Sequence, residues 1–224
     1  MKLNLPFLNR ERYIVLRAYT PVEYLCDHAP VCLSSKVIPE FPRIGKYEIG
    51  FKTCHGFIAS LKRSATVMSP CDFDVKATPK EFSYRWPDQQ HFGVAEHVDT
   101  QWNSSTSFIT KIAMPFVFKS SKKGINFVET RHILNDTPMN IPSGVTTYDY
   151  GTNYNPFNYI PRIDLEYSVT FKKPLIAIYP LSDLPFHVEC YFDPGKYRDY
   201  VESCINRPRF KGFSFSLAST LNKK

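Results

Sequence analysis

The stretch that decides the fold runs from Lys111 to Glu129 and reads KIAMPFVFKSSKKGINFVE. An apolar segment comes first, a polar turn follows it, and a second apolar segment closes the stretch. Gly124 ends the turn, where a positive φ is common and glycine adopts it without steric cost. The pattern therefore predicts a β-hairpin over 111–129.

The same alternation of short apolar segments and turns recurs, with less contrast, through most of the chain. Aromatic residues make up 15% of the sequence, and aromatic side chains suit the half-buried face of a sheet. Eighteen prolines against nine glycines predict stiff, extended connections. These features predict a mainly β fold, either a β-sandwich or a jelly roll. The further strands expected are 13–19, 31–37, 47–51, 71–77, 81–86, 165–171, 175–179 and 186–192.

Two short helices are expected among the strands, at about 53–68 and 194–206. In the first, apolar residues fall at helical spacing after Thr53, which serves as the cap. In the second, Asp193 is the cap and Pro194 occupies the first turn, where proline is well tolerated.

The chain of 224 residues fits the upper end of a single all-β domain. We expect one β-rich domain over 13–207, an extended N-terminal arm over 1–12 and a C-terminal tail over 208–224. Residues 135–162 look irregular, and a loop of that length is either functional or packed against a partner. No apolar run is long enough to span a membrane, and the first residues do not resemble a secretory signal. We therefore expect a protein made and kept in the cytoplasm of a cell.

The net charge of +7 raises the question of nucleic-acid binding. The basic residues gather weakly, and mostly at turns and ends. No basic run is interleaved with aromatic residues, as binders of single strands require. The charge therefore favours an ordinary solvated surface over a nucleic-acid partner.

Six cysteines are scattered along the chain without a C-x-x-C pair, which favours buried free thiols in a reducing compartment. Cys26, His28 and Cys32 are close enough in sequence to share a zinc ion, but no second ligand pair follows them. Cys54 and His55 at a helix start would suit a reactive thiolate, yet a structural cysteine is the favoured interpretation. No cofactor is expected.

The sharpest candidate for chemistry is the pair His97 and Asp99. Residues two apart on a strand point to the same face. His187, on a predicted strand, would complete a two-His, one-carboxylate site for non-haem iron, as in jelly-roll oxygenases that use a 2-oxoacid. Arg198 would then bind the acidic co-substrate. Because so short a pattern arises by chance, and His97 lies in a polar segment, we expect neither a metal nor catalytic residues.

Several short motifs follow one another in order between residues 38 and 182. They are Ile38-Pro39-Glu40-Phe41, Lys52 to Phe57, Ser69 to Asp74, His97, Gln101-Trp102, Lys111, Pro115-Phe116 and Lys172 to Leu181. In this order they resemble an uncharacterised family from tailed, often marine, bacteriophages. The resemblance implies a phage setting, and it carries no activity and no catalytic residues.

The expected function is that of a non-enzymatic structural or accessory subunit of a phage particle, such as a decoration, neck or tail-associated protein. It would be made in the host cytoplasm and located in the virion. Its partners would be other virion proteins, including copies of itself, with no membrane or nucleic acid. The aromatic residues expected to anchor those partners are Phe7, Tyr148, Tyr154, Phe157, Phe213 and Phe215. The alternative function is the iron oxygenase that uses His97, Asp99 and His187.

Overall fold

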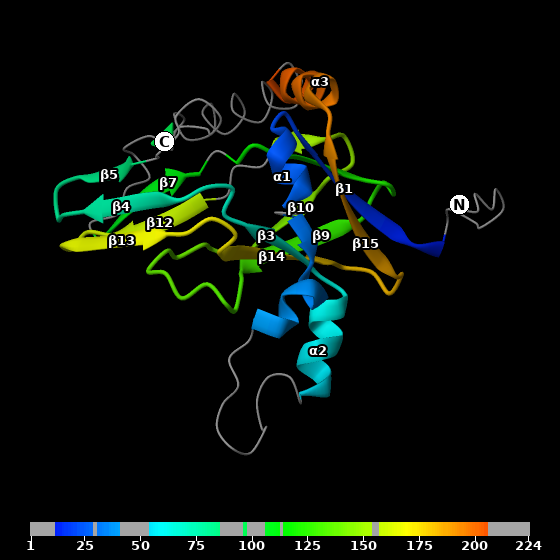
Figure 1. The fold of residues 1–224 in the computed structure, drawn as a ribbon, viewed down its shortest axis with the longest axis horizontal. Coiled ribbons are helices and arrows are strands. Elements are labelled where there is room, and N and C mark those ends of the chain that lie inside the picture. Colours follow the sequence, from blue (N-terminus) through cyan, green and yellow to red (C-terminus); the bar gives the residue numbers. More distant parts are fainter. Residues whose placement is uncertain are drawn as a thin grey trace, which may run out of the picture.

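The structure is a computed structural model, and its strands form a mainly β, sandwich-like fold, as the sequence predicts. The strands pack in two layers with the hydrophobic core between them (Figure 1). The structure describes residues 12–28, 31–40, 54–85, 96–97, 106–112, 114–153 and 157–205.

The strands of this described part form four sheets. Sheet A has the order β11 (Thr152–Asn153), β8 (Val117–Ser120), β1 (Ile14–Thr20) and β15 (Phe186–Phe192). Sheet B has the order β10 (Gly144–Thr147), β9 (Asn126–Arg131), β14 (Pro174–Pro180), β3 (Ala65–Met68) and β2 (Val31–Leu33). Sheet C has the order β13 (Leu165–Val169), β4 (Phe73–Ala77) and β5 (Phe82–Arg85). Sheet D has the order β12 (Phe157–Pro161), β7 (Ser107–Lys111) and β6 (Glu96–His97).

Two antiparallel ribbons join these sheets into layers. β3 and β14 pair in sheet B, and their continuations β4 and β13 pair in sheet C. Between the sheets the ribbon stays closed, because Ser69 and Lys172–Lys173 exchange backbone hydrogen bonds of 2.8 and 3.0 Å. β7 and β12 of sheet D likewise lead into β8 and β11 of sheet A. One layer is therefore B with C, and the other is A with D.

Aromatic rings join the two layers across the core. Phe82 of sheet C meets Phe108 of sheet D with ring centroids 5.0 Å apart. Phe127 of sheet B meets Phe186 of sheet A at 6.3 Å. A single cluster of buried residues includes members of all four sheets. The core therefore runs the whole length of the sandwich.

Three α-helices and one 3-10 helix lie among the described residues outside the sheets. They are α1 (Glu23–Asp27), η2 (Ser34–Glu40), α2 (His55–Lys62) and α3 (Pro194–Ile205). η2 and α2 pack together beside β2, while α3 packs against sheet A (Figure 1). The prediction of a helix at 194–206 is confirmed, and the Asp193 carboxylate accepts a hydrogen bond from the Lys196 backbone N–H at 2.9 Å.

The predicted helix at 53–68 is too long. α2 ends at Lys62, and Ala65–Met68 form β3, an inner strand of sheet B whose four residues are all buried. Ala65 and Met68 fall at helical spacing in the sequence, but a short apolar run also suits a strand that is buried on both faces. Residues 65–68 form a strand and not a helix because they are buried between β14 and β2.

The predicted hairpin over 111–129 is wrong, although both strands exist. β8 pairs with β1 and β11, whereas β9 pairs with β10 and β14. The turn between them crosses from one layer to the other. Gly124 has the expected positive φ of 73°, and its N–H donates to the Asp149 carboxylate at 3.0 Å. β8 and β9 each have a paired strand on both sides. This arrangement satisfies the backbone hydrogen bonds at both edges of each strand, which a hairpin of the two alone would not do.

The irregular stretch expected over 135–162 contains the three strands β10, β11 and β12. The strand expected at 31–37 is also shorter, because β2 ends at Leu33 and η2 follows it. The expected strand at 47–51 lies outside the described residues. The other predicted strands appear, within a few residues at each end, as β1, β4, β5, β13, β14 and β15.

Candidate functional site

The outer face of sheet A carries a group of charged and aromatic side chains beneath α3. In the strand register Arg17 of β1 lies opposite both Lys119 of β8 and Glu189 of β15. Two residues further along β1, Tyr19 lies opposite Tyr191 of β15. Residues opposite one another on paired strands share a face of the sheet. Together with two residues of α3 they form what we call the A-face cluster: Arg17, Tyr19, Lys119, Glu189, Tyr191, Lys196 and Tyr200.

Glu189 organises one side of the A-face cluster. Its carboxylate accepts a hydrogen bond from Arg17 Nε at 3.2 Å and another from the Tyr191 hydroxyl at 2.7 Å. The hydrogen bond to the carboxylate raises the pKa of Tyr191, because it holds the phenol proton in place. The side chains of Arg17 and Glu189 are 36% and 42% exposed, so the ion pair is open to a partner.

Stacked rings form the centre of the cluster. The rings of Tyr19 and Tyr191 stack with centroids 5.6 Å apart and an interplanar angle of 22°. The Tyr19 ring also meets the Tyr200 ring, with centroids 5.5 Å apart. Burial, and then the neighbouring Tyr200, raise the pKa of Tyr19. Tyr191 is 41% exposed, so a buried ring supports a ring that faces solvent.

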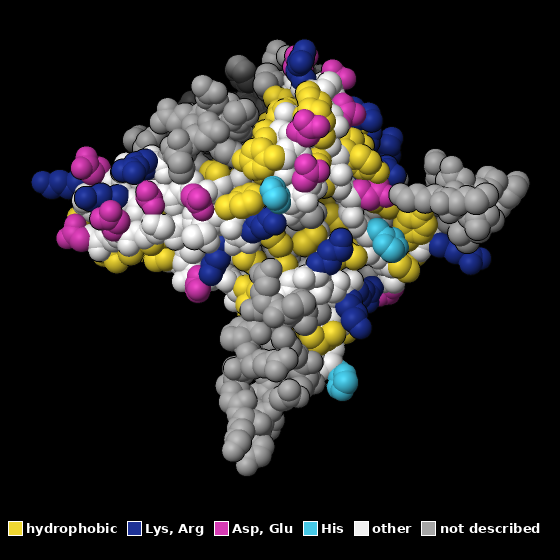
Figure 2. Space-filling model, viewed as in Figure 1, with side chains coloured by type: hydrophobic (Ala, Val, Ile, Leu, Met, Phe, Trp, Pro, Cys, Tyr) yellow, Lys and Arg dark blue, Asp and Glu magenta, His cyan; other side chains and the backbone are white. Residues whose placement is uncertain are grey.

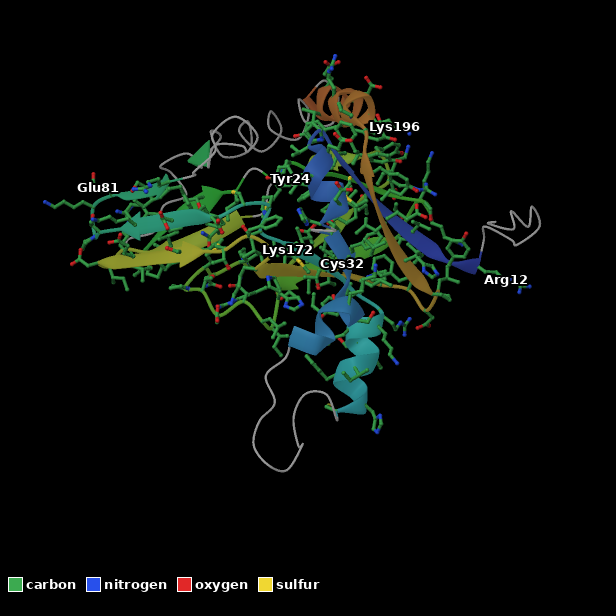
Figure 3. The ribbon with its side chains drawn as sticks, viewed as in Figure 1. Arg12, Tyr24, Cys32, Glu81, Lys172 and Lys196 are labelled. Carbon is green, nitrogen blue, oxygen red and sulfur yellow. The ribbon has the colours of Figure 1, made fainter. Side chains whose placement is uncertain are left out.

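α3 is attached to this face by specific contacts. Lys119 Nζ donates to the Tyr200 hydroxyl at 3.1 Å, and Lys196 Nζ lies 5.3 Å from the centre of the Tyr19 ring. Figure 3 shows Lys196 on α3, above the strands of sheet A. Gly151 lies against Tyr200, where a Cβ atom would come within 2.6 Å of the ring. Glycine at 151 is therefore what allows Tyr200 to pack here.

The chemistry that this surface offers is recognition. It presents ammonium, guanidinium and phenol groups, which donate hydrogen bonds, and aromatic faces, which take apolar or cationic groups. The pattern continues at the turn after β8, where Lys123 Nζ lies 5.6 Å from the ring of Tyr150, a residue that is 49% exposed. Lys and Arg side chains gather along the margin of the molecule beside α3 (Figure 2).

The outer face of sheet C is different in character. Its charges neutralise one another across the strands, with Lys76 4.0 Å from Glu166 and Arg85 3.8 Å from Asp74. Ser168 also donates to the Asp74 carboxylate at 2.6 Å. Figure 2 shows acidic and basic side chains interspersed over this end of the molecule. Such a face is typical of a solvated surface and provides an internal comparison.

The structure moves one expected anchor into the core. Tyr148 is 1% exposed, its ring packs against Phe118 and Phe127, and its hydroxyl donates to the Glu129 carboxylate. Tyr148 therefore joins the two layers and is not a surface anchor, because the stretch around it folds into the sandwich. Phe157 begins β12 opposite Lys111. Phe7, Tyr154, Phe213, Phe215 and the side chain of Phe157 lie outside what the structure describes, and their role stays a prediction.

The proposed iron ligands fall on two separate sheets. His97 is in β6 opposite Thr110 of sheet D, whereas His187 is exposed on β15 of sheet A, where its ring meets Tyr13 at 5.2 Å. In Figure 1, β7, the partner of β6, and β15 lie towards opposite sides. Asp99 lies outside the described residues, so the iron site remains the untested alternative. No group of three or more metal-ligating side chains occurs among the residues described.

The sequence did not favour zinc at Cys26, His28 and Cys32, and in the structure these residues have other neighbours. The Cys26 sulfur faces Cys190, and the His28 ring contacts Phe171 at 5.4 Å. Cys32 belongs to a small buried cluster at sheet B. None of the five cysteines that the structure describes forms a disulfide bond. Cys32 and Cys71 are buried, Cys26 and Cys190 are half-buried, and Cys54 is exposed at the start of α2.

Sequence reasoning missed the A-face cluster, although a signal for part of it exists. Arg17 and Tyr19 are two apart on one expected strand, and Glu189 and Tyr191 are two apart on another. That spacing places each pair on one face. The sequence does not show that β1 and β15 are paired, that they run parallel, or which residues lie opposite one another.

No protein-family model matches this chain, and neither a curated protein nor a solved structure is similar enough to be matched to it. Across the part of the chain that the structure describes, none of the helices combines the length and the hydropathy needed to cross a bilayer.

Proposed function

We propose that this protein is a non-enzymatic structural or accessory subunit of a tailed-phage particle, and that it binds a neighbouring virion protein through the A-face cluster. The phage setting comes from the ordered motifs between residues 38 and 182. The observation that carries the binding surface is the exposed ring of Tyr191 stacked on the buried ring of Tyr19 and flanked by Arg17. Tyrosine and arginine are among the residues that dominate binding energy at protein interfaces.

Charge on this surface indicates the chemistry of the partner. Arg17 and Lys119 lie directly opposite one another on β1 and β8, and like charges in that position repel. Glu189 pairs with Arg17, and Asp193 pairs with Lys196, so the positive side of the cluster depends on Lys119, whose ammonium group donates to the Tyr200 hydroxyl. A partner that brings a carboxylate beside Lys119 and an apolar group onto Tyr191 would complement both features.

The test combines the protein content of purified particles with photo-crosslinking in them. p-Benzoylphenylalanine replaces Tyr191 in one phage and Ser83, on the outer face of sheet C, in the control phage. We expect the protein in washed particles, and a crosslink to one virion protein from position 191 and not from position 83. Absence of the protein from particles would overturn the proposed function. Crosslinking of equal strength from both positions would overturn the choice of surface.

A charge reversal tests the same surface without a probe. Lys119→Glu is expected to lower incorporation into particles about tenfold or more, the size of a hot-spot loss. Lys76→Glu on sheet C is the control, since it makes the same change of charge on a strand; Lys76 is exposed, whereas Lys119 is half-buried. Equal incorporation of the two variants would contradict a role for the A-face cluster.

A further inference from the structure

Two cysteines that are 164 residues apart in sequence lie side by side. The Sγ atoms of Cys26, on α1, and Cys190, on β15, are 3.7 Å apart. A disulfide bond is ~2.05 Å long, so ~1.7 Å separates the two sulfurs from bonding distance. We propose that Cys26 and Cys190 form a disulfide when the protein meets a disulfide oxidant, and that the bond staples α1 to the edge of sheet A.

The backbone on both sides of this pair is well held. Leu25, the neighbour of Cys26, is fully buried, and the Val22 N–H at the start of α1 donates to the Thr20 hydroxyl at 3.2 Å. Cys190 lies in the middle of β15, in register with Ala18 of β1. Because α1 follows β1 after two residues, strand and helix position the two sulfurs together.

The bond would act at one edge of sheet A. β15 is the last strand of sheet A and pairs with β1 along one side only within that sheet. α1 packs against β15. Figure 3 labels Tyr24 on α1. Tyr24 is 40% exposed. A covalent link between them would resist separation of β15 from β1, a parallel pair that no local turn supports. This inference does not depend on the proposed function, since it concerns only the two thiols.

With oxidised glutathione as the oxidant, the reaction balances as two thiol–disulfide exchanges. The Cys26 thiolate attacks one sulfur of glutathione disulfide, expels a glutathione thiolate and forms a mixed disulfide. Cys190 then loses its proton to water and attacks the Cys26 sulfur, which expels the second glutathione thiolate. Burial raises the pKa of both thiols, with the greater rise at Cys190. The more accessible Cys26 therefore reacts first, and the exchange is slow.

The test uses the full chain, equilibrated with either reduced or oxidised glutathione under native conditions. We expect oxidation to remove two hydrogen atoms (two protons and two electrons) from the protein, to yield a Cys26–Cys190 crosslinked peptide and to raise the melting temperature by roughly 5–10 °C. Cys32 falls in the same tryptic peptide as Cys26, since no Lys or Arg lies between them. The mapping is therefore done on a Cys32→Ser background.

Two variants complete the design. Cys190→Ala should abolish the crosslink and the rise in melting temperature, whereas Cys54→Ser, at an exposed cysteine, should keep both. The proposal is overturned if Cys26 and Cys190 both remain open to alkylation after equilibration while Cys54 becomes glutathionylated. It is equally overturned if the crosslink forms and the melting temperature does not rise, because the bond would then not act as a staple.

Discussion

His132 is a buried histidine, and only one of its two ring nitrogens has a hydrogen-bond partner in the structure. Nδ1 accepts a hydrogen bond from the Leu134 N–H at 3.1 Å, and Nε2 is buried without a partner. The residue is 1% exposed, and burial lowers its pKa from 6.5 to about 4. The folded protein therefore holds this histidine neutral at a pH where the unfolded chain binds a proton. Stability at this site is lost as the pH falls from about 6.5 towards 4.

This titration makes a quantitative prediction. Between pH 7 and pH 5, protonation of His132 in the unfolded chain should lower the free energy of unfolding by about 2 kcal/mol. His132→Asn, whose side-chain oxygen can replace Nδ1 as the acceptor, should remove most of that loss. Urea unfolding at the two pH values measures it. The wild-type protein, unfolded in parallel, is the control; an equal loss of unfolding free energy in the wild type and in His132→Asn would contradict the assignment.

Two glycines with the same backbone conformation test the packing of Tyr200. Gly124 and Gly151 have φ of 73° and 75°, but a Cβ atom meets nothing within 4 Å at Gly124 and the Tyr200 ring at Gly151. Gly124→Ala should cost about 1–2 kcal/mol from the left-handed backbone alone. Gly151→Ala should cost at least about 1 kcal/mol more, because overpacking adds to it. Thermal unfolding measures both, and Tyr200→Ala should remove the difference; equal costs in the native background would show that Tyr200 does not occupy this position.

At the scale of the element, the ribbon between sheets B and C bends at Lys172. This residue has a positive φ of 64°, which is unusual for a side chain with a Cβ atom. In Figure 3 it lies at the bend, where the strands of sheet C meet those of sheet B. Its N–H donates to the Ser69 carbonyl, and the Phe171 N–H donates to Asp72. These contacts hold the residue in the strained conformation.

Relief of the strained backbone at Lys172 should stabilise the protein, and this can be tested. Lys172→Gly should raise the free energy of unfolding by about 0.5–1 kcal/mol, since glycine adopts this φ freely but is more flexible in the unfolded chain. Lys173→Gly is the matched control and should destabilise the protein, because Lys173 pairs with Asp136 at 2.6 Å. Chemical denaturation of the two variants distinguishes them. A loss of stability in Lys172→Gly would show that the bend does not need the left-handed conformation.

The N-terminus of α3 supports a prediction about local stability. The Asp193 carboxylate accepts from the Lys196 N–H and lies 3.1 Å from the Lys196 ammonium group. Loss of this cap should let the first turn of α3 open more often. Hydrogen exchange of the Lys196 and Tyr197 amides should accelerate in Asp193→Ala and stay close to the wild-type rate in Asp193→Asn, which keeps an acceptor. Unchanged exchange in Asp193→Ala would mean that packing alone holds the helix.

At the scale of the whole molecule, one core and two continuous ribbons link the four sheets. Phe118 of sheet A is fully buried, and Phe73 of sheet C belongs to the same cluster. Such continuity predicts a single cooperative unfolding transition. It also agrees with the expected single domain over 13–207, which stays a prediction.

A core deletion tests this cooperativity. Phe118→Ala should lower the free energy of unfolding by about 3–5 kcal/mol. The free energy of hydrogen-exchange protection should fall by a similar amount in β1, which pairs with β8, and in β4 of sheet C. Native-state exchange measures both strands in one experiment. Protection that falls at β1 and remains unchanged at β4 would show two independently unfolding units.

The sequence alone determined the mainly β class, the positions of most strands and α3 with its cap. These features depend on local chemistry: the alternation of apolar residues, the fixed φ of proline and the carboxylate of Asp193 next to free backbone N–H groups. The same local information failed at 65–68, where the apolar spacing fits a helix and a buried strand equally well. It was also sufficient to predict the positive φ at Gly124, but not the partners of the strands on either side.

Only the tertiary structure decided which strands pair, because pairing depends on burial of edges and faces that are far apart in sequence. It placed β8 and β9 in different layers and β1 beside β15. The A-face cluster follows from that second pairing, since it brings Arg17 to Glu189 and Tyr19 to Tyr191. The contact between Cys26 and Cys190 has the same origin. Each residue type was visible in the sequence, and its neighbour was set by the packing of the sheets.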